Sequence, residues 1–181
     1  MVKFIYKLYY HTKNMVIIEK LLKEDKISRI VETELKRYTD FFTATYEGNL
    51  EHSKDTMETH PRWSIISGYY AMHDISKLLI AKVYRLKIGS FQVHAITIKI
   101  LKELLKDKEV LELLNKGYEE SRDLVQELSE AKKDRVKVQY YTGTEFMKEK
   151  YKERAKEFYE NVVKRYIEKI KTLLGAYTDD K

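Results

Sequence analysis

Residues 61–86 read PRWSIISGYYAMHDISKLLIAKVYRL and lie in the most apolar region of the chain. Pro61 suits the first turn of a helix, because its missing N–H would have no intrahelical partner there. The apolar residues that follow cover most of the circumference of a helix, which is typical of a helix buried on nearly all sides. The pattern therefore predicts a central helix from Pro61 to Gly89.

Polar and aromatic side chains form a stripe along one side of this helix. At about 100° per residue they fall within an arc of about 100°. In one interpretation the stripe is the wetter edge of a buried helix, where Asp74 neutralises Lys77 and hydrogen-bonds to His73. In the other it lines a cleft or a dimer interface. The stripe consists of Tyr70, His73, Asp74 and Lys77.

The same helical period extends over most of the chain. It predicts a first helix or helix pair over about 15–46, ended by Gly48 and Asn49. It also predicts a third helix over about 91–105 and a fourth from about 107 toward 141.

A fifth helix is expected near the end of the chain. Thr142 and Glu145 have the spacing of a capping box, with Thr144 as a competing cap, and the helical pattern then continues to Gly175. Amphipathic helices with short connections pack most simply as an antiparallel up-and-down bundle, here of four to five helices. The expected fold class is therefore all-α.

The composition agrees with one helical domain. A chain of 181 residues fits a single core, which we expect over 15–175, with an N-terminal extension at 1–14 and a polar tail at 176–181. The extension could be a short strand, a packed tail or the result of a mis-set start codon. One proline and six glycines are few breakers, and with abundant Lys, Arg and Glu they also suit a thermophilic source.

Several kinds of site are excluded or disfavoured. The chain has no cysteine, so disulfides, zinc–thiolate sites and thiol nucleophiles are excluded. No second histidine stands at helical ligand spacing from His73, so we expect no metal. No phosphate loop, nucleophile elbow or metalloprotease motif is present, and we expect no cofactor. His52 and His60 lie in a polar connection and are expected to be exposed.

The charge and the N-terminus bear on partners and location. The net charge of +6 is spread among acidic residues, which weakens a nucleic-acid interpretation. The densest basic run, KKDRVKVQYYTG at 132–143, is either a solvated helix end or a nucleic-acid contact. Apolar runs near the N-terminus reach only three residues, far short of the ~20 that span a bilayer, so a cytoplasmic protein without membrane contact is expected.

Three segments resemble the HEPN domain family in order and spacing. Residues 67–86, SGYYAMHDISKLLIAKVYRL, are similar to its tyrosine-rich second helix, which often reads YYAxxxAxKALL. Residues 93–105, VHAITIKILKELL, look like its following helix, which often opens with a histidine. Residues 130–174 look like its Arg-then-Tyr segment and last helix, so the resemblance covers about residues 27–174.

This resemblance implies a helical bundle that usually dimerises. Family members occur with nucleotidyltransferase partners, in toxin–antitoxin modules, or with nucleotides or RNA. Many are metal-independent ribonucleases that use an arginine followed, after four to six residues, by a histidine. No pair here has that spacing, since the nearest, Arg85 and His94, has eight residues between. Arg135 is instead followed after four residues by Tyr140, and a phenol with a pKa of about 10 is a poor base near neutral pH.

The sequence thus favours a dimeric HEPN-like binding module and leans away from catalysis. Its ligand would be a nucleotide, an RNA or a nucleotidyltransferase-type protein. One alternative is a ribonuclease in which folding brings Arg135 to His73 or His94. Another is a bundle that only binds or supports other proteins. The expected ligand- or interface-lining residues are Tyr70, His73, Asp74, Lys77, Arg135 and Tyr140.

Overall fold

The computed structural model describes residues 15–89, 92–105, 107–133 and 145–178. The described chain is almost entirely helical, as the all-α prediction requires. The expected extension at 1–14, the expected caps at 142 and 144, and residues 179–181 lie outside the described residues. The elements are α2 (Met15–Lys23), β1 (Ile27–Arg29), α3 (Glu32–Asp55), α4 (Pro61–Tyr84), β2 (Leu86–Ile88), α5 (Val93–Leu104), α6 (Lys108–Lys133), α8 (Glu145–Phe158), η1 (Tyr159–Val163) and α9 (Lys164–Thr178).

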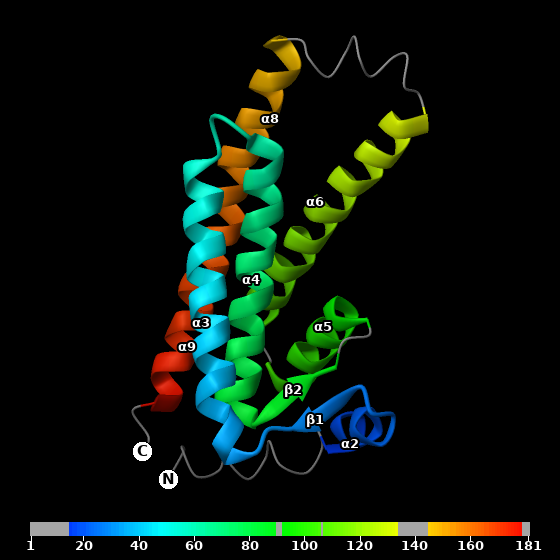
Figure 1. Cartoon of the computed structure of the whole chain (residues 1–181), viewed down its shortest axis with the longest axis vertical. Helices are drawn as coiled ribbons and strands as arrows, with labels where there is room; N and C mark the ends of the chain where they lie inside the picture. Colours follow the sequence, from blue (N-terminus) through cyan, green and yellow to red (C-terminus); the bar gives the residue numbers. More distant parts are fainter. Residues whose placement is uncertain (1–14, 90–91, 106, 134–144, 179–181) are drawn as a thin grey trace.

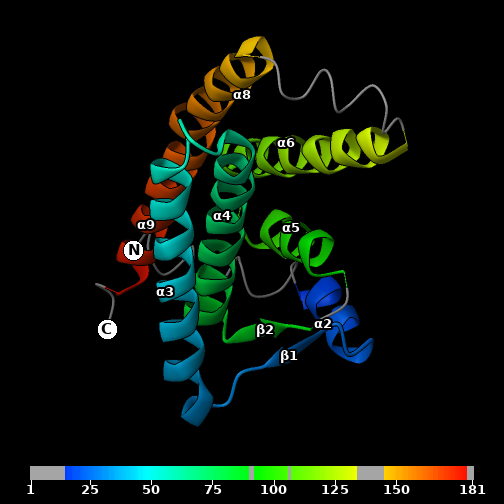
Figure 2. The same cartoon turned by 45° about the horizontal axis from the view of Figure 1, so that its top comes forward.

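The long helices alternate in direction along the chain. In Figure 1, α3 runs upward, α4 downward, α6 upward, and α8 through α9 downward. η1 is a single π-helical turn that joins α8 to α9, so the three form one continuous helical rod. α3 and α4 lie side by side over their whole length, whereas α6 diverges from them toward its C-terminal end (Figure 2).

α4 is the central helix, as its apolar pattern predicts. It packs against α3, α5, α6, β2 and all three parts of the C-terminal rod. Burial of apolar side chains in one continuous cluster is the main stabilising contribution to such a fold. The cluster draws residues from α2 through α9, and the α4 side chains at its centre include Ile65, Met72, Ile75, Leu79 and Ile80.

The first helix or helix pair expected over about 15–46 is a pair, α2 and α3, and the strand β1 between them was not predicted. α2 ends at Lys23, and Asp25 adopts a left-handed φ of 51°, which Asp tolerates better than most residues. β1 then pairs antiparallel with β2, with Ile27 opposite Ile88. Ile27 is buried in this short ladder, so tertiary burial outweighs the local helical pattern.

The predicted end of α3 at Gly48 and Asn49 is also wrong. The helix continues to Asp55, so most of the connection that was expected to be polar and irregular is helical. Reciprocal hydrogen bonds hold this last part of α3 to α4. Ser53 Oγ donates to the carbonyl oxygen of Ser64 at 2.8 Å, and Ser64 Oγ donates to that of Ser53 at 2.6 Å.

The other boundaries differ less from expectation. α4 ends at Tyr84 rather than near Gly89, because Arg85 adopts a left-handed φ of 56° and β2 follows. At the C-terminus, α9 continues past Gly175 to Thr178, so the expected polar tail begins as helix. Among the described residues, no helix is both long enough and apolar enough to cross a membrane.

Candidate functional site

The polar stripe on α4 runs from the surface into the interior. Tyr70 is 44% exposed, whereas His73 is only 3% exposed. Asp74 is buried as well, and the side chain of Lys77 is 17% exposed. The stripe is therefore not a uniform surface. Tyr70 is accessible to solvent, whereas His73 and Asp74 are covered by the rest of the protein.

Asp74 lies at the centre of a buried polar network between α3 and α4. Its Oδ1 is 3.5 Å from Lys77 Nζ, and its Oδ2 accepts a hydrogen bond of 3.2 Å from Asn49 Nδ2. Lys77 Nζ also lies 4.9 Å from the centre of the Phe42 ring. The expected neutralisation of Lys77 by Asp74 is therefore present.

Burial acts against both charges of this pair. It raises the pKa of Asp74 above 3.8 and lowers the pKa of Lys77 below 10.5, and in each case the attraction of the partner opposes burial. We treat the two as an ion pair at neutral pH, because their ordinary pKa values lie on opposite sides of neutrality. Loss of one partner would leave the other charge buried and poorly compensated.

His73 joins α4 to α5 as a neutral ring. Its Nε2 lies 3.2 Å from Thr97 Oγ1, and that hydroxyl donates to the carbonyl oxygen of Val93 at 2.8 Å. Because the hydroxyl proton is used there, Nε2–H of His73 is the donor to Thr97. The expected hydrogen bond to Asp74 is absent, since His73 Nδ1 is 3.9 Å from Asp74 Oδ1 and has no hydrogen-bond partner.

The environment strongly opposes protonation of His73. Burial, and then the charge of Lys77, lower the pKa of His73 to about 2. The imidazole is therefore neutral at neutral pH, and its burial blocks direct contact with a large ligand.

His94 packs directly on His73 from α5. The two ring centres are 4.3 Å apart, and Tyr69 Oη lies 2.5 Å from His94 Nδ1. Burial, and then the charge of Lys77, lower the pKa of His94 below its usual value. His94 therefore contacts the middle of α4.

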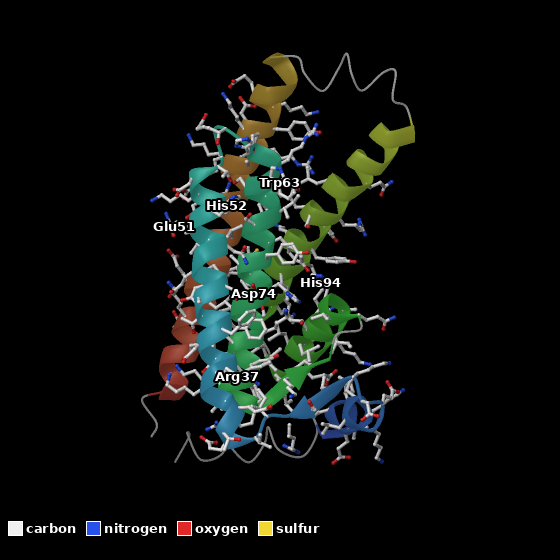
Figure 3. All side chains as sticks on the ribbon, in the orientation of Figure 1. Arg37, Glu51, His52, Trp63, Asp74 and His94 are labelled. Carbon is white, nitrogen blue, oxygen red and sulfur yellow. The ribbon has the colours of Figure 1, made fainter. Side chains whose placement is uncertain are left out.

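Partly exposed rings from three helices meet around His94. Tyr70 of α4 and Tyr118 of α6 have ring centres 6.2 and 6.3 Å from that of His94. Tyr118 is 37% exposed, and His94 is half-buried. We call Tyr70, His94 and Tyr118 the aromatic platform. In Figure 3, His94 lies on the side of α4 that faces α5 and α6.

The structure places all four residues of the predicted stripe on α4 and adds a residue that sequence reasoning missed. This residue is Tyr118 of α6, and no local spacing in the sequence links it to His94 or Tyr70. Arg135 and Tyr140 lie outside the described residues. The residues of the prediction that meet are Tyr70, His73, Asp74 and Lys77 on α4, with His94 from α5.

The other described histidines are exposed, as expected. His60 lies in the turn before α4, and His52 on α3 places its Nδ1 2.9 Å from Ser67 Oγ. Among the described side chains, no group of three His, Cys, Asp or Glu residues could hold a metal ion.

An open pocket of about 350 Å³ lies elsewhere, between α6 and the C-terminal rod. Four of its residues are acidic and two are basic, and the aromatic platform contributes none of them. No described side chain that lines it is a buried polar group without a partner, so nothing at this pocket indicates a ligand. Its lining is Lys116, Glu119, Glu120, Asp123, Arg154, Glu157, Phe158, Asn161 and Val162.

Comparisons of the chain with protein-family models, with curated proteins and with solved structures give no match.

Proposed function

We propose that the chain is a HEPN-like, dimeric binding module whose aromatic platform receives a nucleotide or RNA without cleaving it. The observation that carries this proposal is the pair of exposed rings, Tyr70 and Tyr118, around His94. Aromatic rings stack on bases of any sequence, and each stacked base contributes about 1–3 kcal/mol. The resemblance of residues 67–86 to the second HEPN helix supports the same function.

Electrostatic attraction plays a smaller part in this proposal. The net charge of +6 attracts phosphates in general, and Lys77 is the cation of the stripe. Lys77 is already paired with Asp74 and is mostly buried, so it adds little as a direct phosphate ligand. We therefore expect stacking to contribute more than charge, and the affinity to fall only moderately as salt is added.

The positions of the histidines support binding rather than cleavage. A general base must reach the proton that it abstracts, and His73 is buried, neutral and in contact with Thr97. His94 is more accessible, but its Nδ1 is hydrogen-bonded to Tyr69. One nitrogen of His94 is left for a ligand, which is enough for a hydrogen bond to a base.

A ribonuclease is the second candidate, because two imidazole rings lie 4.3 Å apart beside an exposed surface. In this mechanism His94 would exchange protons with RNA, and Arg135 would be brought to it. Incubation of purified protein with RNA, with His94→Ala and His73→Ala as controls, tests it. Cleavage that both substitutions abolish would favour the enzyme, and no cleavage by the wild-type protein would count against it.

A protein ligand of nucleotidyltransferase type, as in a toxin–antitoxin pair, would use the same exposed rings. Aromatic residues are enriched in the centres of protein interfaces, so the platform suits this partner also. A binding assay with the product of an adjacent nucleotidyltransferase gene separates the two ligands, because a nucleotide that shares the platform would compete with the protein.

Equilibrium binding to Tyr118→Ala tests the main proposal. The chain has one tryptophan, Trp63, which is 60% exposed and lies two turns before Tyr70 on α4, so its fluorescence reports on ligands nearby. We expect a mononucleotide or a short RNA to bind at low salt, and loss of one stacking ring to weaken binding by about 5- to 150-fold.

Phe41→Ala is the matched control, because Phe41 is an exposed ring on α3 that is not part of the platform. It should leave the affinity unchanged. If no nucleotide or RNA binds at low salt, or if both substitutions weaken binding equally, the platform is not the ligand site.

A further inference from the structure

α5 is joined to α4 by a pair of stacked imidazoles. His73 of α4 and His94 of α5 have ring centres 4.3 Å apart. Each ring also makes a hydrogen bond across the same boundary, His73 with Thr97 at 3.2 Å and His94 with Tyr69 at 2.5 Å. Two uncharged rings can pack in this way, whereas two imidazolium cations at this distance would repel each other strongly.

The charged groups nearby do not favour protonation. Lys77, on the same helix as His73, opposes a positive charge on either ring. Asp74 is the acidic residue that faces both rings, since its Oδ1 lies 3.9 Å from His73 Nδ1 and it attracts a charge on His94, but it already holds Lys77 and the amide of Asn49 from α3. The groups that face the pair from α6 and α5 are the hydroxyl-bearing side chains of Tyr118 and Thr97.

The remaining contacts of α5 are fewer than those of the long helices. α5 has 12 residues and packs on α4, α6 and β2, whereas α3 and α4 are 24 residues each and lie together over their whole length. A positive charge without a partner between α4 and α5 therefore weakens the packing of α5, which is less extensive than the packing of α3 on α4. Release of α5 can precede unfolding of the bundle.

We propose that protonation of His73 and His94 releases α5 from α4, so that mild acid opens this part of the protein while the α3–α4 hairpin stays folded. In the released state each ring is in water and can hold its proton. Because α5 carries His94, release also removes one ring of the aromatic platform.

The size of the effect follows from linkage. Both histidines have lowered pKa values in the packed state, so release takes up protons as the pH falls below about 6.5. At pH 5.5, one unit below that value, a histidine that titrates only after release raises the opening constant about tenfold. Two such histidines raise it by up to about a hundredfold, and the opening of α5 should return to its low value above about pH 7.

Amide hydrogen exchange of the whole chain, followed by NMR between pH 7.5 and pH 5, measures this opening once intrinsic exchange rates are removed. We expect the opening constant of α5 amides to rise by about tenfold to a hundredfold at pH 5.5, with little change in α3 and α4. His94→Gln keeps polar groups at this position but cannot titrate, so its rise should be limited to about tenfold.

His60→Gln is the control, because His60 is exposed in the turn before α4 and far in sequence from α5. It should behave as the wild-type protein does. An α5 whose opening does not depend on pH, or that opens only together with α3 and α4, would overturn the proposal. If His73→Gln fails to fold, the wild-type and His94→Gln proteins still decide the question.

The release of α5 does not depend on the proposed function, but its effect on a ligand does. Nucleotide affinity at pH 7.5 tests the platform, and exchange of α5 tests the release. A chain that binds no nucleotide can still release α5 in acid, and a chain that binds nucleotide can keep α5 in place at every pH. The two failures are therefore distinguishable.

Discussion

Buried hydroxyl groups on α4 and α9 have hydrogen bonds with a defined direction. Ser76 Oγ lies 2.6 Å from the carbonyl oxygen of Met72 and 2.6 Å from Tyr166 Oη. A serine has one hydroxyl proton, and the carbonyl oxygen of Met72 can only accept it. Tyr166 therefore donates to Ser76, and both side chains are fully buried at this contact.

This direction predicts unequal effects of two similar substitutions. Ser76→Ala leaves the buried hydroxyl of Tyr166 without an acceptor and should destabilise the protein by about 1–3 kcal/mol. Tyr166→Phe leaves the bond from Ser76 to Met72 intact and should cost about 0.5–1.5 kcal/mol. Urea unfolding measures both, and the double variant should lose less than the sum. Equal costs, or a larger cost for Tyr166→Phe, would contradict this assignment of donor and acceptor.

Sequence could predict which residues share a side of α4, but not how deeply each is buried. Helical periodicity alone places Tyr70, His73, Asp74 and Lys77 on one side. Their burial depends on other elements, because α5 covers His73 and α3 covers Asp74. Tyr118 joins the site only through the packing of α6, which no local pattern encodes.

The close packing of α3 and the C-terminal rod on α4 depends on Gly68, which has no side chain. A methyl group added at Gly68 would lie 2.8 Å from Val163 Cγ2 and 2.9 Å from Ser53 Oγ. α3 and the C-terminal rod therefore approach α4 closely at this glycine. Gly48 on α3 is the opposite case, since a methyl group there would have no neighbour within 4 Å.

Alanine substitutions at these two glycines should change the free energy of unfolding in opposite directions. Gly68→Ala forces the neighbouring helices apart, at a cost of about 1–3 kcal/mol that exceeds the gain of about 0.5–1 kcal/mol in helix propensity. Gly48→Ala keeps only that gain and should raise the free energy of unfolding. Thermal and urea unfolding of the two variants check this, and a Gly68→Ala protein as stable as Gly48→Ala would disprove the close approach.

The sequence predicted helices better than their boundaries. Long periodic segments such as α4 and α6 begin within a few residues of where they were expected. The pattern did not predict β1 and β2, because each has three residues and its partner lies beyond α3 and α4 in the sequence. The predicted helix end at Gly48 is wrong because an exposed glycine within a helix costs only about 1 kcal/mol, which the rest of α3 outweighs.

Among the described residues, tyrosine side chains are buried in several packed helices, including α3, α4 and α9. Burial raises the pKa of Tyr46 in α3 to about 12 and raises the pKa values of Tyr69 in α4 and Tyr166 in α9 still further. In the unfolded chain the same groups ionise near pH 10. The folded state therefore holds protons that the unfolded state loses, and its stability is complete below pH 10 and decreases as the pH rises above it.

Tyr166 isolates this effect, because its ring belongs to the core. One tyrosine that stays neutral when folded lowers the free energy of unfolding by about 1.4 kcal/mol between pH 9 and pH 11. Urea unfolding at both pH values should thus show a smaller loss in Tyr166→Phe than in wild type, by about that amount. The comparison uses differences between pH values, so the constant cost of the lost hydrogen bond cancels. If Tyr166→Phe loses as much stability as the wild type between pH 9 and pH 11, the core does not hold the Tyr166 hydroxyl neutral.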